Sequence, residues 1–314
     1  MLLAAAALLA PPPPAEARTR AAARRQAKVA QELRIIRRDA IAPPEDIAGG
    51  EGGRWSLDLQ LPLLWNANPG ARHPPGRGDV QATPEARLGW SHRPAAVPLR
   101  LAATLDAAAD RYGRSGIAGS DTLFLRLRAQ RESGRDDQEV QPFVMLQSAR
   151  DHEPGWGSRL ESRHDLTLGA AAELNLDRSW RRVPRGPDTR DATAWSLGLN
   201  LGVQRRWREE APPSLALVAN PSAGWTPHRR FTASLELEAA RRWHARDGQG
   251  RRRDWLAAPV LTLEWLPAEG WLPGWLGAPA VNLQVFGARQ WSSRAEWDFR
   301  QGGAGPLLRT TWRF

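Results

Sequence analysis

A serine and a histidine stand two residues apart, at Ser162 and His164, on one predicted strand. That spacing puts both side chains on one face of the strand, where a histidine could activate a serine as a nucleophile. The acids Asp136, Asp137 and Glu139 are of the kind that binds a divalent cation. For Ser162 and His164, the stronger interpretation is a serine and a histidine that do not interact. For the three acids, the stronger interpretation is a polar turn. We therefore expect no catalytic residues, no metal site and no cofactor, and we expect that the protein is not an enzyme.

The composition narrows the class of protein. The 314 residues include no cysteine, which excludes disulfides and thiolate chemistry. Tryptophan occurs 16 times and tyrosine once, and tryptophan is enriched at membrane interfaces. A mean hydropathy of −0.52 excludes a bundle of apolar membrane helices. It is compatible with membrane strands, in which only alternate residues face lipid.

The charge points to an anionic partner. The formal net charge is +10, and Lys28 is the one lysine among 44 basic residues. Lipopolysaccharide phosphates, anionic solutes or nucleic acid would complement this charge. Biased codon usage is the alternative explanation of the arginine content. We expect lipid and lipopolysaccharide as partners, and no nucleic acid.

The first 54 residues differ from the rest. Leucine and alanine dominate residues 1–10, and Ala15-Glu16-Ala17 has the form of a cleavage site, so residues 1–17 are predicted to be a signal peptide. Residues 18–54 are predicted to form a short basic helical segment, over 18–39, followed by a flexible linker. The helical segment could bind nucleic acid, lie on a membrane surface or plug a lumen, and a solvated extension is the stronger interpretation.

From residue 55 to residue 314 the pattern has a period of two. Leu57, Leu59 and Leu61, for example, alternate with Asp58 and Gln60, which places each set on one face of a strand. We predict an all-β domain of about twelve strands, with ten or fourteen as alternatives, and no interrupting helix. The predicted strands are 55–65, 80–90, 99–107, 122–128, 140–148, 164–175, 195–204, 214–225, 231–238, 255–265, 280–291 and 307–314.

Tryptophans bracket several of the apolar stripes. A ten-residue spacing, as between Trp55 and Trp65, spans roughly 33 Å along a strand. In a tilted strand this projects to roughly 25 Å, the height of the apolar band of a membrane barrel. A soluble sandwich would have shorter strands and would not bury the charges of the other face. The predicted interface girdle comprises Trp55, Trp65, Trp195, Trp207, Trp255, Trp265 and Trp312.

The last eight residues, Leu307 to Phe314, resemble the C-terminal β-signal of Gram-negative outer-membrane proteins. Leu308, Trp312 and Phe314 fit the apolar and aromatic positions of that signal. The resemblance implies an antiparallel up-and-down transmembrane β-barrel in the outer membrane, inserted by the barrel-assembly machinery. An even strand number would leave both termini periplasmic. No subfamily is identified.

The opposite face carries the functional hypothesis. In a closed barrel the inward arginines would form a basic wall of the lumen, and the inward glutamates would form an acidic wall opposite it. The electric field between two such walls orients solutes in diffusion channels. We expect a narrow, porin-like passive channel for small solutes, with anions favoured. One alternative is a lipid or lipopolysaccharide hydrolase that uses His164. Another is a structural barrel with a closed lumen that binds lipopolysaccharide through arginines such as Arg251 to Arg253. The candidate pore-lining residues are Arg87, Arg100, Arg126, Arg128, Glu236, Glu238, Glu264, Arg309 and Arg313.

Overall fold

The computed structural model describes most of the chain from Arg54 to Phe314. The described residues are 54–67, 78–113, 119–131, 140–183, 192–209, 211–248, 250–268, 271 and 273–314. The predicted signal peptide (1–17) and the basic segment with its linker (18–54) lie outside them, apart from Arg54. The acids Asp136, Asp137 and Glu139 also lie outside them. The described residues contain no helix long and apolar enough to cross a membrane.

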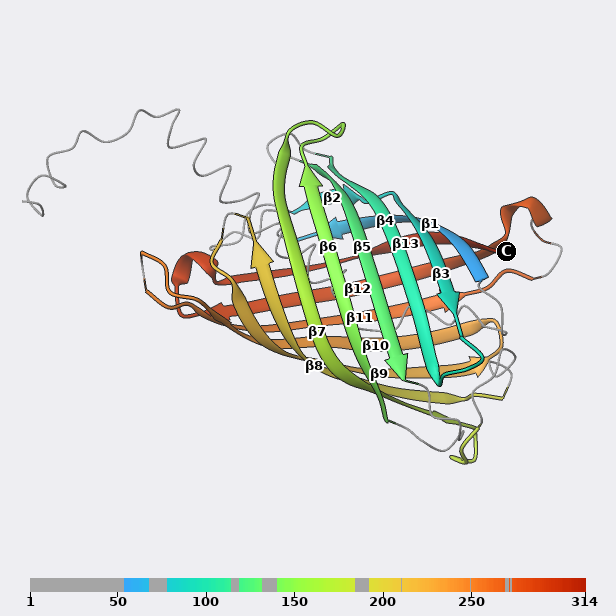
Figure 1. Ribbon diagram of the computed structural model, residues 1–314. Helices are drawn as coiled ribbons and strands as arrows, with labels where there is room; N and C mark the ends of the chain where they lie inside the picture. The colour runs from blue at the N-terminus through green and yellow to red at the C-terminus, as the bar shows by residue number, and fades with distance from the viewer. Residues whose placement is uncertain are drawn as a thin grey trace, which may run out of the picture.

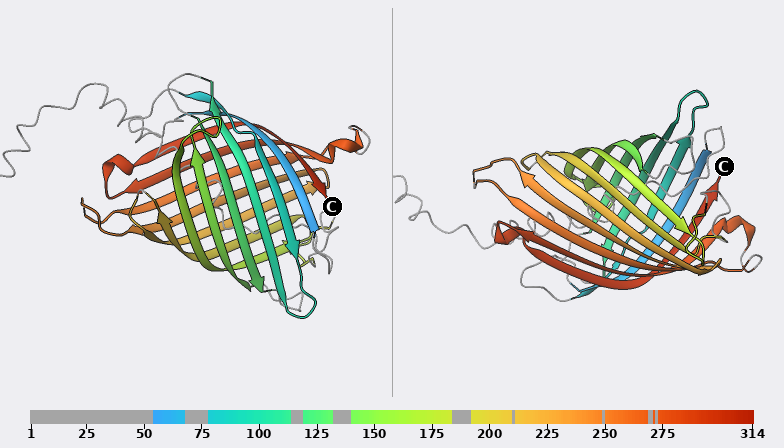
Figure 2. Two further views of the ribbon diagram at one scale, coloured as in Figure 1. Left: turned by 45° about the horizontal axis from the view of Figure 1, so that its top comes forward. Right: turned by 90° about the horizontal axis from the view of Figure 1, so that it is seen from below.

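The strands form one antiparallel sheet that closes on itself (Figures 1 and 2). From β4 to β13 each strand pairs with the next, β2 and β3 both lie between β1 and β4, and β1 pairs with β13, which closes the barrel. The strands are β1 (Arg54–Asn66), β2 (Asp79–Ala82), β3 (Glu85–His92), β4 (Leu99–Tyr112), β5 (Ser120–Arg131), β6 (Val140–His152), β7 (Arg159–Leu176), β8 (Trp195–Arg208), β9 (Ser214–His228), β10 (Phe231–His244), β11 (Arg253–Trp265), β12 (Ala278–Ser292) and β13 (Phe299–Arg313). Short 3-10 helices, η2 (Gly274–Leu276) and η3 (Ala295–Trp297), lie in two connections.

The segments β2 and β3 are two parts of one barrel strand. Both keep the same register against β1 and against β4. The interruption falls at Thr83 and Pro84, because proline has no N–H to donate to a neighbouring strand. The Thr83 N–H still donates to the Pro62 carbonyl of β1, at 3.1 Å. The prediction of a twelve-stranded barrel is therefore confirmed, and ten or fourteen strands are excluded.

Apolar side chains cover the outside of the barrel, and polar side chains line the inside. In β1, Leu59, Leu61 and Leu63 are exposed, whereas Ser56 and Asp58 are buried. The same alternation continues around the sheet, so that exposed leucines and valines form a continuous outer band. A soluble protein rarely exposes so large an apolar surface. The fold is that of a transmembrane β-barrel, the class that the C-terminal β-signal implies.

Both ends of the described chain lie at one end of the barrel. The Trp55 N–H donates to the Phe314 carbonyl at 3.2 Å, and the Phe314 N–H donates to the Trp55 carbonyl at 2.9 Å. We call this the terminal end, and we call the end at which β1 finishes the far end. The prediction that the termini are periplasmic corresponds to a terminal end that faces the periplasm, and it stays a prediction.

The last strand begins earlier than the sequence predicted. It starts at Phe299, not near 307, and its first half contains Gly302, Gly303 and Gly305. These glycines hide the strand signal, since glycine is depleted in strands. A β-carbon at Gly305 would overlap the Leu63 carbonyl oxygen of β1. Glycine therefore permits the close approach of β13 to β1 that closes the barrel.

Candidate functional site

The barrel interior holds all the candidate pore-lining residues, which occupy inward positions of their strands. They differ in how far water reaches them. Glu236 and Arg313 are exposed, whereas Arg87, Glu264 and Arg309 are partly buried. The buried ones are Arg100, Arg126, Arg128 and Glu238.

Several of these charges pair with neighbours along the wall. The Arg87 Nε donates to Asp106 on the adjacent strand at 2.5 Å, and Arg309 donates to Asp58 of β1 at 3.1 Å. Asp58 also accepts a hydrogen bond from the Thr311 hydroxyl. Pairs of this kind neutralise charge without a bridge across the lumen.

Two buried arginines on β5 lie against aromatic rings. The Arg128 guanidinium carbon lies 3.9 Å from the centroid of the Phe143 ring, and its Nε donates to Gln130 at 3.0 Å. Arg126 lies 5.3 Å from the centre of the Phe124 ring. Cation–π contact favours this arrangement most where water is excluded. The arginines are thus held close to the wall.

A fully buried ion pair of the described interior was not predicted from the sequence. Arg206 on β8 donates to both carboxylate oxygens of Asp165 on β7, at 2.7 and 2.8 Å, and each side chain is 1% exposed. Arg206 and Arg242 also donate to the Gln204 side-chain oxygen, at 3.4 and 3.2 Å. The alternation of β7 and β8 could have shown that Asp165, Gln204 and Arg206 point inward, because they lie at the inward-facing positions of the two strands.

A second missed cluster lies at the far end of β10 and β11. The His244 Nε2 lies 2.8 Å from a carboxylate oxygen of Asp254, and the Arg252 Nε lies 2.9 Å from the same oxygen. The Ser292 hydroxyl donates to the other oxygen at 2.7 Å. The Arg252 guanidinium carbon also lies 4.0 Å from the centroid of the Trp297 ring. These contacts connect the far ends of β10, β11 and β12.

The inner charges are more mixed than two opposed walls. Inward acids occur on β2, β4, β6 and β7, away from the acidic wall expected on β10 and β11. Arginines occur on β7, β8 and β10, close to the expected acidic wall. Acids and arginines are thus interspersed around the described inner face. The inward acids that the sequence analysis missed are Asp79, Asp110, Asp151, Glu161, Asp165 and Asp254.

Water access divides the interior into two parts. At the terminal end, the wall formed by β10 and β11 is accessible, and Glu236 is exposed although it points inward. Towards the far end, inward side chains such as Leu64, Phe124, Arg206 and Phe299 are less than 2% exposed. At the terminal end of β3 to β6, inward side chains such as Ser91, Gln130 and Phe143 are buried as well. The described inner face thus has an accessible vestibule beside β10 and β11, and it is closely packed in the far half and along β3 to β6.

The predicted girdle tryptophans all lie on the outer face, in two rows. The terminal-end row holds Trp55, Trp195, Trp265 and Trp312, and the far-end row holds Trp65, Trp207 and Trp255. Further outward tryptophans extend both rows, and three cross-strand pairs join Trp55 to Trp90, Trp195 to Trp225, and Trp255 to Trp291.

Residues of the predicted assembly signal also point outward. Leu308 is exposed, and the Trp312 ring N–H donates to the Trp275 carbonyl at 3.0 Å. Phe314 is 74% exposed. The lipid-facing side of the last strand thus presents all three residues to the surroundings.

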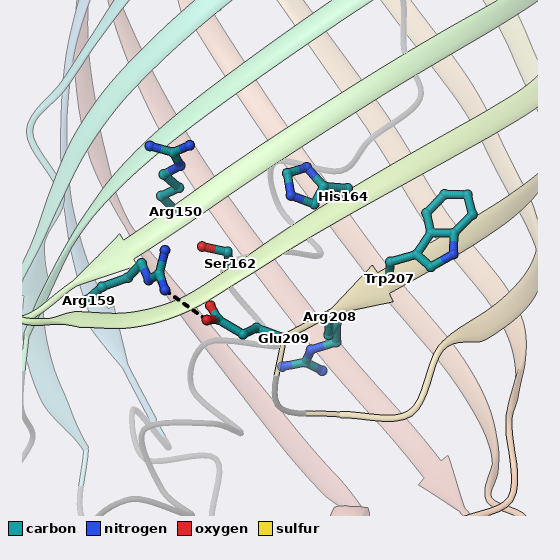
Figure 3. Close-up of a pocket in the computed structure, with 7 residues that line it drawn as sticks. All are labelled: Arg150, Arg159, Ser162, His164, Trp207, Arg208 and Glu209. Atoms are coloured by element: carbon teal, nitrogen blue, oxygen red, sulfur yellow. Dashed lines mark hydrogen bonds and ion pairs between the residues drawn. The ribbon is translucent and has the colours of Figure 1, made fainter.

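Ser162 and His164 lie outside the barrel, in a pocket of about 360 Å³ on β6 to β8 (Figure 3). The Ser162 hydroxyl makes no hydrogen bond with any described residue, so Ser162 and His164 do not form the bonded pair of a nucleophile and its base. Within the described ranges, no cluster of three or more histidines and acids could hold a metal ion.

No family model and no curated protein matches the chain. Similar solved structures include an outer-membrane channel of Pseudomonas putida, with a TM-score of 0.47 and 12% identity over 87% of this chain and 100% of that chain. The translocator domain of the autotransporter NalP of Neisseria meningitidis has a TM-score of 0.43 and 11% identity, over 92% and 97%. The outer-membrane protein OmpT of Vibrio cholerae has a TM-score of 0.37 and 7% identity, over 86% and 100%.

Proposed function

We propose that the protein is a narrow passive channel of the outer membrane for small polar solutes, with its terminal end in the periplasm. The observation that supports this most is the inner face of the closed barrel. It carries charged and polar side chains, and the inward Glu236 is exposed in the terminal half. Twelve strands give an interior between filled eight-stranded barrels and open porins.

The far half would set the rate and selectivity of passage. A solute leaving the vestibule would have to pass Phe124, Phe299 and the Asp165–Arg206 pair, all of which are buried. The anion preference expected from the net charge has no counterpart on the described inner face, where acids and arginines are interspersed. We therefore propose weak charge selectivity and strong selection by size.

Planar-bilayer recording of the refolded full-length chain tests the channel. We expect discrete conductance steps and a reversal potential near zero in a salt gradient. A heat-dependent shift in electrophoretic mobility serves as the control for folding. Folded protein that gives no conductance steps would exclude the proposal.

The burial of the far half favours one second candidate, a structural barrel with a closed lumen. Liposome swelling in small sugars separates the two, because a closed barrel leaves the swelling rate at that of empty liposomes. We also propose that the barrel is not an enzyme, since Ser162 and His164 are not joined by a hydrogen bond. Lipid hydrolysis that disappears in His164→Ala would contradict this.

A further inference from the structure

The outward pocket on β6 to β8 has the chemistry of an anion site. Figure 3 shows Arg150 and Arg159 on one side of Ser162, with His164 and Trp207 on the other. The strand register explains the grouping, because Arg150 is the cross-strand partner of Ser162 and His164 is that of Trp207. The pocket volume of about 360 Å³ lies in the lower part of the range of small-molecule sites.

The cations of this pocket are available to a ligand. Arg150 is exposed and makes no hydrogen bond or ion pair with any residue in the described part of the chain. Arg159 donates to Glu209 at 2.8 Å, but the two side chains are 52% and 46% exposed. An ion pair as exposed as this contributes little, typically about 0–1 kcal/mol. A dianionic group could therefore displace Glu209 from Arg159.

The ligand chemistry that fits is a phosphate group. Phosphate oxygens accept charge-assisted hydrogen bonds from arginine in a bidentate geometry. The Ser162 hydroxyl adds a donor that no described residue engages. Arg208, which also lines the pocket, is bound to Glu161 at 2.5 and 2.7 Å and completes the floor.

The position of the pocket on the barrel points to a phosphate carried by a lipid. Trp207 belongs to the far-end row of outward tryptophans, which marks the membrane interface. Arg205, one outward position closer to the membrane centre, places its guanidinium carbon 5.9 Å from the Trp207 ring centre. Leucines of the apolar band follow directly below. A lipid whose chains lie on this band would bring its headgroup to the pocket.

The distribution of outward arginines is an independent observation that favours the same leaflet. Among the described strand residues, Arg131 is the only outward-pointing arginine at the terminal end. At the far end, outward arginines occur on most strands. Arg241 lies 4.7 Å from the Trp255 ring, and Arg289 lies 5.5 Å from the Trp291 ring. This far-end arginine belt comprises Arg111, Arg150, Arg205, Arg241, Arg253, Arg289 and Arg300.

We propose that the pocket lined by Arg150, Arg159, Ser162 and His164 binds the phosphate group of a lipid headgroup in the leaflet at the far end. Arg150 and Arg159 hold the phosphate oxygens, and Trp207 packs against the adjoining part of the lipid. This site does not depend on whether the lumen conducts. The far-end arginine belt places seven arginines on the outer face, whereas acids and arginines are interspersed on the described inner face.

Binding of fluorescently labelled, bisphosphorylated lipid A to the refolded full-length chain in neutral detergent tests the proposal. We expect Arg150→Gln and Arg159→Gln each to weaken binding by about tenfold, the factor for one lost charge-assisted hydrogen bond. We expect Glu209→Gln to tighten binding, because it removes the anion that competes for Arg159. That change of sign separates a ligand contact from a structural role.

Arg131→Gln is the matched control, since it removes an exposed outward arginine at the other end of the barrel, and we expect it to leave the affinity unchanged. Equal weakening in Arg131→Gln and Arg150→Gln would overturn the proposal, as would equal binding of lipid A stripped of its phosphates. Inorganic phosphate that binds as tightly as lipid A would overturn the assignment to a lipid. Heat-dependent mobility shifts verify that each variant is folded.

Discussion

The buried pair of Asp165 and Arg206 gives the sharpest test of how the interior is stabilised. Both side chains are 1% exposed, and two hydrogen bonds of 2.7 and 2.8 Å join them. Replacing Asp165 by asparagine leaves Arg206 in a closely packed interior without its carboxylate. Removing one partner of a buried pair typically costs about 3–5 kcal/mol. We expect Asp165→Asn to lower the free energy of unfolding by that amount.

The two partners should not be equivalent. Asp165 also interacts electrostatically with Arg163 and Arg242, so its removal leaves several cations without their shared anion. Arg206→Met leaves Asp165 beside two arginines, and we expect a smaller loss. The double variant should recover part of the loss seen in Asp165→Asn alone.

Urea unfolding in detergent micelles, followed by tryptophan fluorescence, measures these differences. The variants can be compared if the dependence of the unfolding free energy on urea concentration is the same for each. Glu209→Gln is the control, because it breaks an exposed pair and should cost less than about 1 kcal/mol. If Asp165→Asn and Glu209→Gln lower the free energy of unfolding equally, burial does not govern the strength of these pairs and the reasoning is wrong.

Three further changes have distinct readouts. Gly305→Val should prevent closure of β13 on β1, because a side chain there collides with the Leu63 carbonyl. The fast-migrating electrophoretic band of the folded barrel should then disappear. Gly248→Ala should retain that band, because the space around Gly248 is open. Glu236→Arg should shift the reversal potential of the channel towards anion selectivity, and an unchanged potential would place Glu236 off the path. Phe314→Ala should reduce insertion in cells but leave refolding in detergent intact, because the exposed ring makes few contacts in the barrel; equal loss in both assays would contradict a role in assembly.

Strand positions and faces could be predicted because they depend on local pattern. Successive residues of a strand point to opposite faces of the sheet, so the alternation of apolar and polar residues shows which face each residue is on. It placed Trp55, Leu59 and Asp58 on the correct faces of β1. The start of β13 could not be predicted, because Gly302 to Gly305 carry no apolar stripe. Their role is apparent only when β1 lies against them.

The interior contacts depend on register between strands far apart in the sequence. Asp165 and Arg206 become partners only because β7 and β8 align them across a long connection. A shift by two residues would keep every side chain on its face and yet separate this pair. The outward pocket has the same origin, since Arg150, Ser162 and Trp207 come from three strands. Parity predicts which residues line a face, whereas the clusters within the face require the sheet.

The uneven packing of the interior has an electrical consequence. A potential applied across a membrane falls mainly over the region that excludes water, and on the described inner face that region includes the far half. Charges such as Asp165 and Arg206 would therefore experience most of the field, whereas Glu236 in the vestibule would experience little of it. Moving one elementary charge through about 100 mV corresponds to about 2.3 kcal/mol, and one member of an ion pair displaced within the constriction would couple to a fraction of that energy. Voltage applied in a recording would thus act directly on the ion pairs of the constriction.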